Sequence, residues 1–186
     1  MRQLFREEAK VIGRETSFDN SIVANMIEEA LVFCAAKTAT GTKQRALDVL
    51  LQGDCSACGY VRYGLAKGIA QYLSSIDDTI KAVYIYEPEY ATADDEIAGS
   101  RLSSGINLLA WVKRKTAALN SIVACLDTAL LEERKRLLCP EAIAECFSLD
   151  VKVADDDEVR RRRGYGALVN SIFVRPTKVW ERSDEL

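Results

Sequence analysis

The chain has 186 residues, of which 48% are hydrophobic and 28% are charged, and its formal net charge is −3. This composition is typical of a soluble globular protein with a sizeable core, and the charge provides no general attraction to nucleic acid or to anionic membranes. The chain has no histidine, which excludes histidine general bases, Ser-His-Asp triads and histidine-containing zinc sites. No apolar run reaches about 18 residues and the N-terminus lacks an apolar signal core, so we expect no membrane span and a cytoplasmic location.

Three helices are predicted in the first part of the chain. The first follows the capping residues at 19–21 and runs to about Lys37, with apolar residues at helical spacing. Thr42 caps a short second helix that Gly53 ends, and Asp54 caps a third helix. We therefore expect a helical layer over residues 1–75.

Two glycines lie in the predicted third helix, at positions 64 and 68. Glycine weakens a helix, but two glycines four residues apart share one face and allow another element to approach closely. We expect such an approach along this face.

The first two predicted strands follow the helical layer. Residues 80–86 are rich in β-formers, and Pro88 ends this strand because proline cannot donate to a ladder. Residues 106–112 are apolar on both faces, which indicates a central strand in a sheet covered on both sides.

The remaining elements complete the sheet-containing part, residues 76–186 of a single domain. A long helix is predicted from Thr116 to about Leu138, and Pro140 opens a short helix to Cys146. Residues 149–153 alternate as a strand, and residues 171–180 form a last strand at an edge, because a proline lies within it. The predicted fold class is α/β (α+β): a small mixed sheet with helices on its faces.

The second strand and its neighbours carry a resemblance to a known family. Ser104 to Val112 read Ser-Gly-Ile-Asn-Leu-Leu-Ala-Trp-Val, and the third strand carries Asp150. The order strand–strand–helix–strand with these residues resembles the core of the nucleotidyltransferase superfamily, whose second strand usually reads Ser-Asp-Ile-Asp-Leu-Leu and whose third strand carries one more Asp. The resemblance covers about residues 60–153 and implies a nucleotidyltransferase-like fold.

The chain departs from that family where the metal-binding acids belong. Two acids at alternate positions of a strand point to one face and can share a magnesium ion, but these positions are Gly105 and Asn107 here. The first strand is followed by Glu87 and Glu89 where the family has a phosphate-binding Gly-Ser pair, and glutamates repel a triphosphate. We therefore expect a protein that has lost catalysis, with Asp150 as the one remaining acid of the set.

The expected function is binding of a partner protein, a second copy of the chain or a nucleotide-like ligand. The candidate ligand-binding residues are Ser104, Asn107, Asp150 and Glu87. The alternative is an active transferase that needs magnesium. In that case Asp150 and Asn107, together with Glu87 or Glu89, have to hold the metal.

A thiol function is a further alternative. Cys55 and Cys58 form a Cys-x-x-Cys pair at a predicted helix N-terminus, where a thiol pKa can be lowered and a redox couple or metal site can form. Asp54 opposes thiolate formation, and a zinc site needs two more ligands. The other interpretation is two small residues that pack a helix start.

The run Asp155 to Arg163 contains four consecutive arginines, which is typical of a phosphate- or RNA-binding patch. In a helix, however, each acid at 156–158 faces an arginine four residues later and neutralises it locally. Apart from Tyr165, no aromatic residue accompanies the patch for base stacking. We favour a solvated helix over a nucleic-acid interface.

Overall fold

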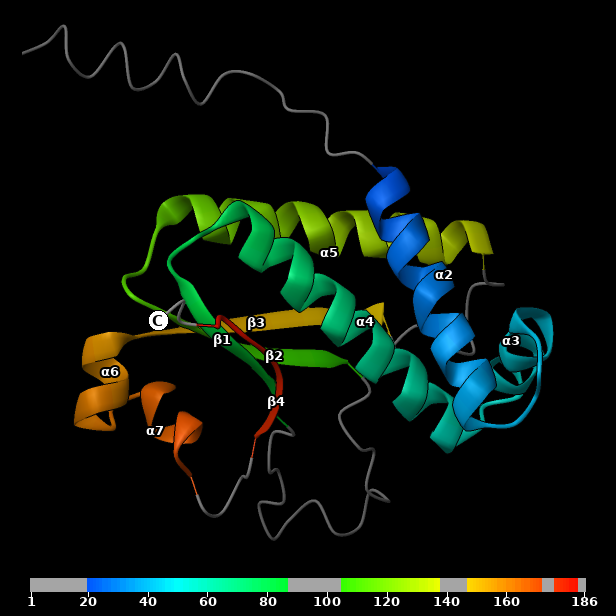
Figure 1. Cartoon of the computed structure of the whole chain (residues 1–186). Helices are drawn as coiled ribbons and strands as arrows, with labels where there is room; N and C mark the ends of the chain where they lie inside the picture. The colour runs from blue at the N-terminus through cyan, green and yellow to red at the C-terminus, as the bar shows by residue number, and fades with distance from the viewer. Residues whose placement is uncertain (1–19, 87–104, 138–146, 172–175, 184–186) are drawn as a thin grey trace, which may run out of the picture.

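A computed structural model describes residues 20–86, 105–137, 147–171 and 176–183 of the chain. It confirms the predicted mixed α/β class (Figure 1). The helices are α2 (Asn20–Lys37), α3 (Lys43–Leu51), α4 (Cys55–Ile76), α5 (Ala117–Leu137), α6 (Asp156–Arg161) and α7 (Gly166–Val169). The strands are β1 (Ile80–Ile85), β2 (Ile106–Val112), β3 (Leu149–Asp155) and β4 (Thr177–Glu181). The short helix predicted for 140–146 lies outside the described residues.

The strands form one mixed sheet in the order β3-β2-β1-β4. Strand β1 pairs antiparallel with both β2 and β4, and β2 pairs parallel with β3 through the crossover helix α5. The central place predicted for β2 is confirmed. The last strand is at an edge as predicted, but the strand begins at Thr177, after Pro176, and Ser171 is not part of it.

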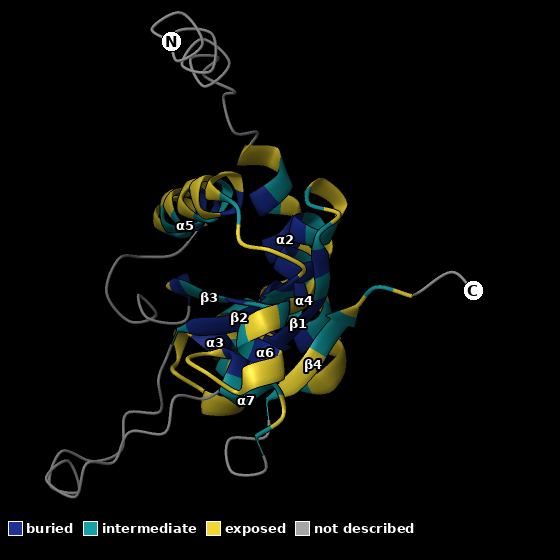
Figure 2. Ribbon diagram, turned by 90° about the vertical axis from the view of Figure 1, so that its left-hand side faces the viewer, coloured by how far each residue is buried: buried dark blue, intermediate teal, exposed yellow. Residues whose placement is uncertain are grey.

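Helices cover both faces of the sheet, but unequally. Helices α2, α4 and α5 form a layer on one face, with α3 beside α2 and α4, whereas α6 and α7 lie on the other face (Figures 1 and 2). The larger core lies under the helical layer and contains the alternate β2 residues Ile106, Leu108 and Val112. A smaller core on the opposite face contains Leu109, packed by Trp111. Strand β2 is therefore buried from both sides, as its sequence predicts.

The helix pair α2/α4 runs in opposite directions. Gly68 of α4 lies against Met26 near the start of α2, whereas Cys34 near the end of α2 donates to the carbonyl oxygen of Ala57 in the first turn of α4, over 3.6 Å. Gly64 lies between these points, against Ala30. The predicted close approach along the glycine face of this helix is confirmed.

Capping side chains begin the helices where the sequence predicts. Thr42 accepts a hydrogen bond from the amide of Arg45, and Asp54 accepts one from the amide of Ala57. Asp155 forms a capping box with Glu158 at the start of α6. None of the helices in the described ranges is long and apolar enough to cross a membrane.

Candidate functional site

Asn107 and Asp150 lie directly opposite each other in the parallel β2–β3 pair. Residues paired in this way are about 4.8 Å apart along the hydrogen-bonding direction and point to the same face of a sheet. The sequence-based hypothesis required these two positions to be neighbours on adjacent strands, and the structure brings them together.

The carboxylate of Asp150 is already paired with a cation. Lys152, two residues later on the same face of β3, places its Nζ 2.8 Å from Asp150 Oδ1 and 5.6 Å from the ring centroid of Tyr165. The hydrogen bond from Lys152 to Asp150 outweighs the desolvation of the ammonium and raises the pKa of Lys152 above its ordinary value. Asp150 therefore already has a cationic partner within its own strand.

These residues do not fit a magnesium site. Magnesium prefers carboxylate oxygens, and at this point of β2 the chain offers one amide, Asn107, and at Gly105 no side chain. A Cβ added at Gly105 would lie 3.1 Å from the carbonyl oxygen of Ser148, so the start of β3 leaves little room for a ligand there. The described residues contain no group of three His, Cys, Asp or Glu side chains that could hold a metal ion. The candidates Ser104, Glu87 and Glu89 lie outside the described residues.

A small pocket lies between α4 and the ends of three strands. Its lining includes Arg62 and Tyr63 of α4, Thr177 of β4 and the start of β2 at Asn107, and its volume is about 240 Å³. Asn107 alternates with Ile106 and Leu108 of the larger core, so its side chain points to the α6/α7 face of the sheet and the residue meets the pocket only at the end of the strand. Apolar residues such as Ile85 complete the wall, and none of the described residues that line it is acidic. An apolar wall with a few convergent polar groups is the usual composition of a ligand site. We call it the Asn107 pocket.

Asn107 was predicted from the sequence, whereas Arg62, Tyr63 and Thr177 were not. The sequence predicts that residues 62 and 63 lie within a helix, but it does not predict the angle at which α4 crosses the sheet. The arrival of β4 beside β1, which brings Thr177 to the pocket, is a long-range pairing that leaves no local signal.

Cys55 and Cys58 are in different states. Cys55 is an exposed free thiol in the first turn of α4, and Cys58 is disulfide-bonded, so the two are not joined to each other. The carboxylate of Asp54 caps the same helix N-terminus, and this places a negative charge close to the Cys55 thiol. A redox couple made by these two cysteines is therefore not formed in this structure.

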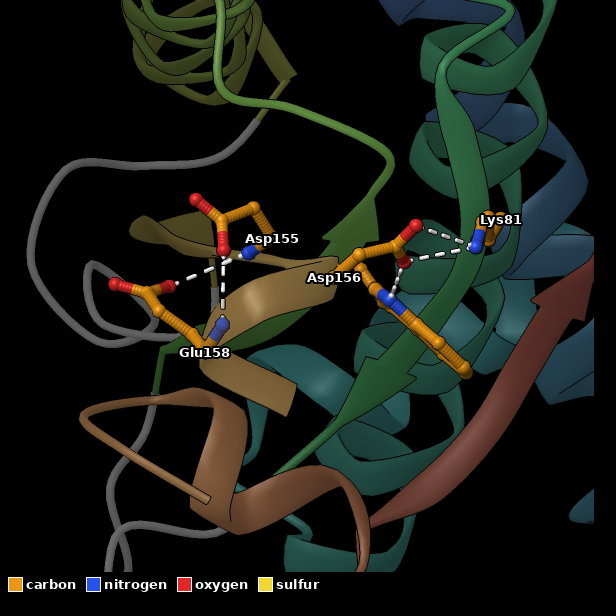
Figure 3. Close-up of polar contacts among 5 residues, drawn as sticks. Lys81, Asp155, Asp156 and Glu158 are labelled. Carbon is orange, nitrogen blue, oxygen red and sulfur yellow. Dashed lines mark hydrogen bonds and ion pairs between the residues drawn. The ribbon is translucent and has the colours of Figure 1, made fainter. Parts of the chain in front are cut away.

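A polar cluster fastens α6 to the sheet (Figure 3). Asp156 accepts hydrogen bonds from Lys81 of β1 at 2.7 and 2.8 Å and from the indole nitrogen of Trp111 at 2.8 Å. The Lys81 ammonium also lies 5.2 Å from the centroid of the Trp111 ring. Burial alone raises the pKa of Asp156, but the hydrogen bonds from Lys81 and Trp111 and the charges of Lys81 and Lys113 outweigh it, so the pKa lies below the ordinary value.

The predicted charge pairing of this segment is right in one case of three. Arg161 pairs with Asp157 at 2.9 Å, as expected for positions four apart, and Arg160 shares the same carboxylate at 2.7 Å. The other two acids are used elsewhere: Asp156 bonds Lys81, and Glu158 bonds Lys115 at 2.6 Å. The helix ends at Arg161, so Arg162 lies outside it and cannot pair with Glu158 across one helical turn.

Comparisons with known proteins identify no significant relative of this chain. No protein-family model matches the chain, and neither the curated proteins nor the solved structures contain a significant match. The candidate site therefore depends on the geometry described above.

Proposed function

We propose that this protein is a non-catalytic, nucleotidyltransferase-like binding protein that takes a nucleotide-like anion in the Asn107 pocket. The pairing of Asn107 with Asp150, at the positions where the family resemblance places metal-binding acids, supports the non-catalytic part of the proposal. One of these positions is an amide, and the carboxylate of the other is paired with Lys152. These two positions therefore carry less negative charge than a shared metal site on the two strands would require. The observation that supports the anion is the presence of Arg62 in a pocket whose described lining has no acidic residue.

The composition of the pocket supports an anionic ligand. Arg62 supplies a guanidinium, which binds phosphate and carboxylate oxygens through two parallel hydrogen bonds. Thr177 and Tyr63 supply hydroxyl groups, and no acidic residue in the described lining repels an anion. The volume of about 240 Å³ suits a phosphorylated sugar or a similar fragment of a nucleotide rather than a large molecule.

Binding of ATP and GTP measured by isothermal titration calorimetry tests the proposal. We expect binding that is the same with magnesium and with a chelator, because no step of recognition uses a metal. Arg62→Gln should weaken binding at least about tenfold, since a charge-assisted hydrogen bond contributes roughly 1.5–3 kcal/mol. Lys67→Gln, on the same helix but outside the pocket, serves as the matched control.

The active-transferase alternative predicts the opposite dependence. In that case nucleotide binding requires magnesium, Asp150→Ala abolishes it, and pyrophosphate is released when a suitable acceptor is present. The proposal expects Asp150→Ala to bind nucleotide like the wild type. A wild-type protein that binds neither ATP nor GTP contradicts both readings and leaves the partner-protein or self-association function that the sequence also predicts.

A further inference from the structure

An open groove follows the outer surface of the α2/α4 pair. Its lining contains the aromatic residues Phe33, Tyr60 and Tyr63 and the two lysines Lys37 and Lys67, and its volume is about 660 Å³. Phe33 stacks on Tyr63 with ring centroids 5.6 Å apart and meets Tyr60 edge to face at 6.3 Å. We call this surface the aromatic groove.

The aromatic rings remain accessible although they contact each other. Tyr63 is 36% exposed, and Phe33 and Tyr60 are half-buried. Accessible aromatic side chains on a rigid helix pair offer large contact area with little loss of side-chain entropy on binding. Tyrosine in particular is enriched among the residues that dominate binding energy in protein interfaces.

The charge of the groove has one sign. The two lysines lie toward opposite ends. Lys37 is one turn beyond Cys34, which contacts Ala57 at the start of α4, and Lys67 is three turns further along α4. None of the described lining residues is acidic, in a chain whose net charge is −3. The groove is thus a local positive, aromatic surface on an acidic protein, and it complements an anionic partner.

The shape of the groove favours an extended chain over a small molecule. The lining runs along α4 from Ser56 to Lys67, about 16 Å at the rise of an α-helix, which matches about five residues of extended peptide. Small-molecule sites enclose most of their ligand, whereas this groove is open along its length. An extended peptide can place an apolar or aromatic side chain on the rings and carboxylates near the lysines.

We propose that the aromatic groove docks an acidic segment of a partner protein that carries an aromatic or large apolar side chain. The groove adjoins the Asn107 pocket and shares Gly59 and Tyr63 with it, whereas Lys37, Lys67, Phe33 and Tyr60 line the groove and not that pocket. Variants at the residues that line the groove alone therefore test docking apart from nucleotide binding.

Fluorescence anisotropy with a labelled random copolymer of glutamate and tyrosine tests the docking surface. We expect the copolymer to bind the full-length protein, more tightly than polyglutamate, with an affinity that falls as salt is raised. Lys37→Glu/Lys67→Glu should lower the affinity at least about tenfold, because it reverses both charges that meet the ligand. Tyr60→Ala should reduce copolymer binding toward the level of polyglutamate.

A variant matched in net charge controls for the general electrostatic effect. Lys113→Glu/Lys135→Glu makes the same change of charge outside the groove lining, and we expect it to change the affinity less than about twofold. Failure of the copolymer to bind overturns the proposal, as do equal losses in the two double variants, or equal binding of copolymer and polyglutamate. A single-stranded oligonucleotide that binds more tightly than the copolymer, and is lost in Lys37→Glu/Lys67→Glu, overturns it in favour of nucleic acid. ATP titration of the same variants shows whether the Asn107 pocket is affected.

Discussion

Gly64 of α4 packs against the backbone of Ala30 in α2. A Cβ added at Gly64 would lie 2.8 Å from the Cα and 2.9 Å from the Cβ of Ala30, closer than two carbon atoms can pack. The missing side chain is therefore what sets the separation of the two helices that carry the aromatic groove. Ala30 is itself almost fully buried, so it cannot move aside into solvent.

Gly64→Ala should lower the free energy of unfolding by about 1–3 kcal/mol, the usual range for overpacking. The loss should appear although alanine is the better helix former by about 1 kcal/mol. Chemical denaturation measures it. Gly59→Ala is the matched control, since nothing lies within 4 Å of a Cβ added there, and it should stabilise the protein by up to about 1 kcal/mol. Equal stabilisation by both substitutions would show that the helices are not in contact at Gly64.

The contacts of Asp156 predict an acid-dependent loss of stability. Its pKa in the folded protein lies below the ordinary value of 3.8 because Lys81 and Trp111 stabilise the carboxylate more than burial opposes it. A depressed pKa stabilises the fold at pH values above 3.8, and this contribution is lost as the pH falls through the folded pKa. Asp156→Asn should therefore cost up to about 1 kcal/mol at neutral pH, since the pair is partly exposed, and almost nothing in strong acid.

Tryptophan fluorescence provides a local readout of the same contact. In a Trp180→Phe background, emission comes from Trp111, whose indole nitrogen donates to Asp156. We expect an acid transition of the emission below pH 4 in this protein and its absence in the protein that also carries Asp156→Asn. An identical transition in both would mean that Asp156 does not control the surroundings of Trp111.

The position of Asn107 predicts how the protein responds to an acidic residue placed there. Asn107 is 6% exposed and faces Asp150 across the β2–β3 pair. Asn107→Asp should lower the free energy of unfolding by about 1–3 kcal/mol at neutral pH, because a buried second carboxylate loses hydration beside the first. The deficit should shrink as the pH is lowered, since protonation removes the added charge.

Divalent metal should partly reverse this deficit. We expect magnesium or manganese to raise the melting temperature of Asn107→Asp and not that of the wild type, because two carboxylates on one face can share a cation. Asn107→Ser, which adds no charge, is the control. A wild-type protein that is stabilised by magnesium to the same extent as Asn107→Asp would contradict the expectation that Asn107 and Asp150 do not hold a divalent metal.

Alkylation at neutral pH without a reductant should separate the cysteines by environment. Cys55 and Cys125 are exposed free thiols and should react within minutes, whereas Cys58 is disulfide-bonded and should not react. Cys34 should react slowly, because burial raises its thiol pKa. The charge of Asp54 also raises this pKa, and the hydrogen bond with Thr38 lowers it only in part. Peptide mass spectrometry reads all four, and rapid labelling of Cys58 would restore the hypothesis of a Cys55–Cys58 couple.

Local patterns were sufficient for most of the secondary structure. The bounds of β2 and the caps Thr42 and Asp54 follow from residue type and spacing, because a strand buried on both faces and a capped helix N-terminus each depend on neighbours in the chain. The last strand was predicted too long, since the ladder with β1 begins only after Pro176.

The candidate site divides in the same way. The sequence by itself determined that positions 105 and 107 hold Gly and Asn and not acids, and it placed the small-residue face of α4. Only the tertiary structure decided that Asn107 pairs with Asp150, that Lys152 and Lys81 neutralise the nearby carboxylates, and that α2 and α4 together present an aromatic groove. Strand register and helix crossing are set by packing between residues far apart in the chain, whereas chain spacing encodes only what neighbours along the backbone can do.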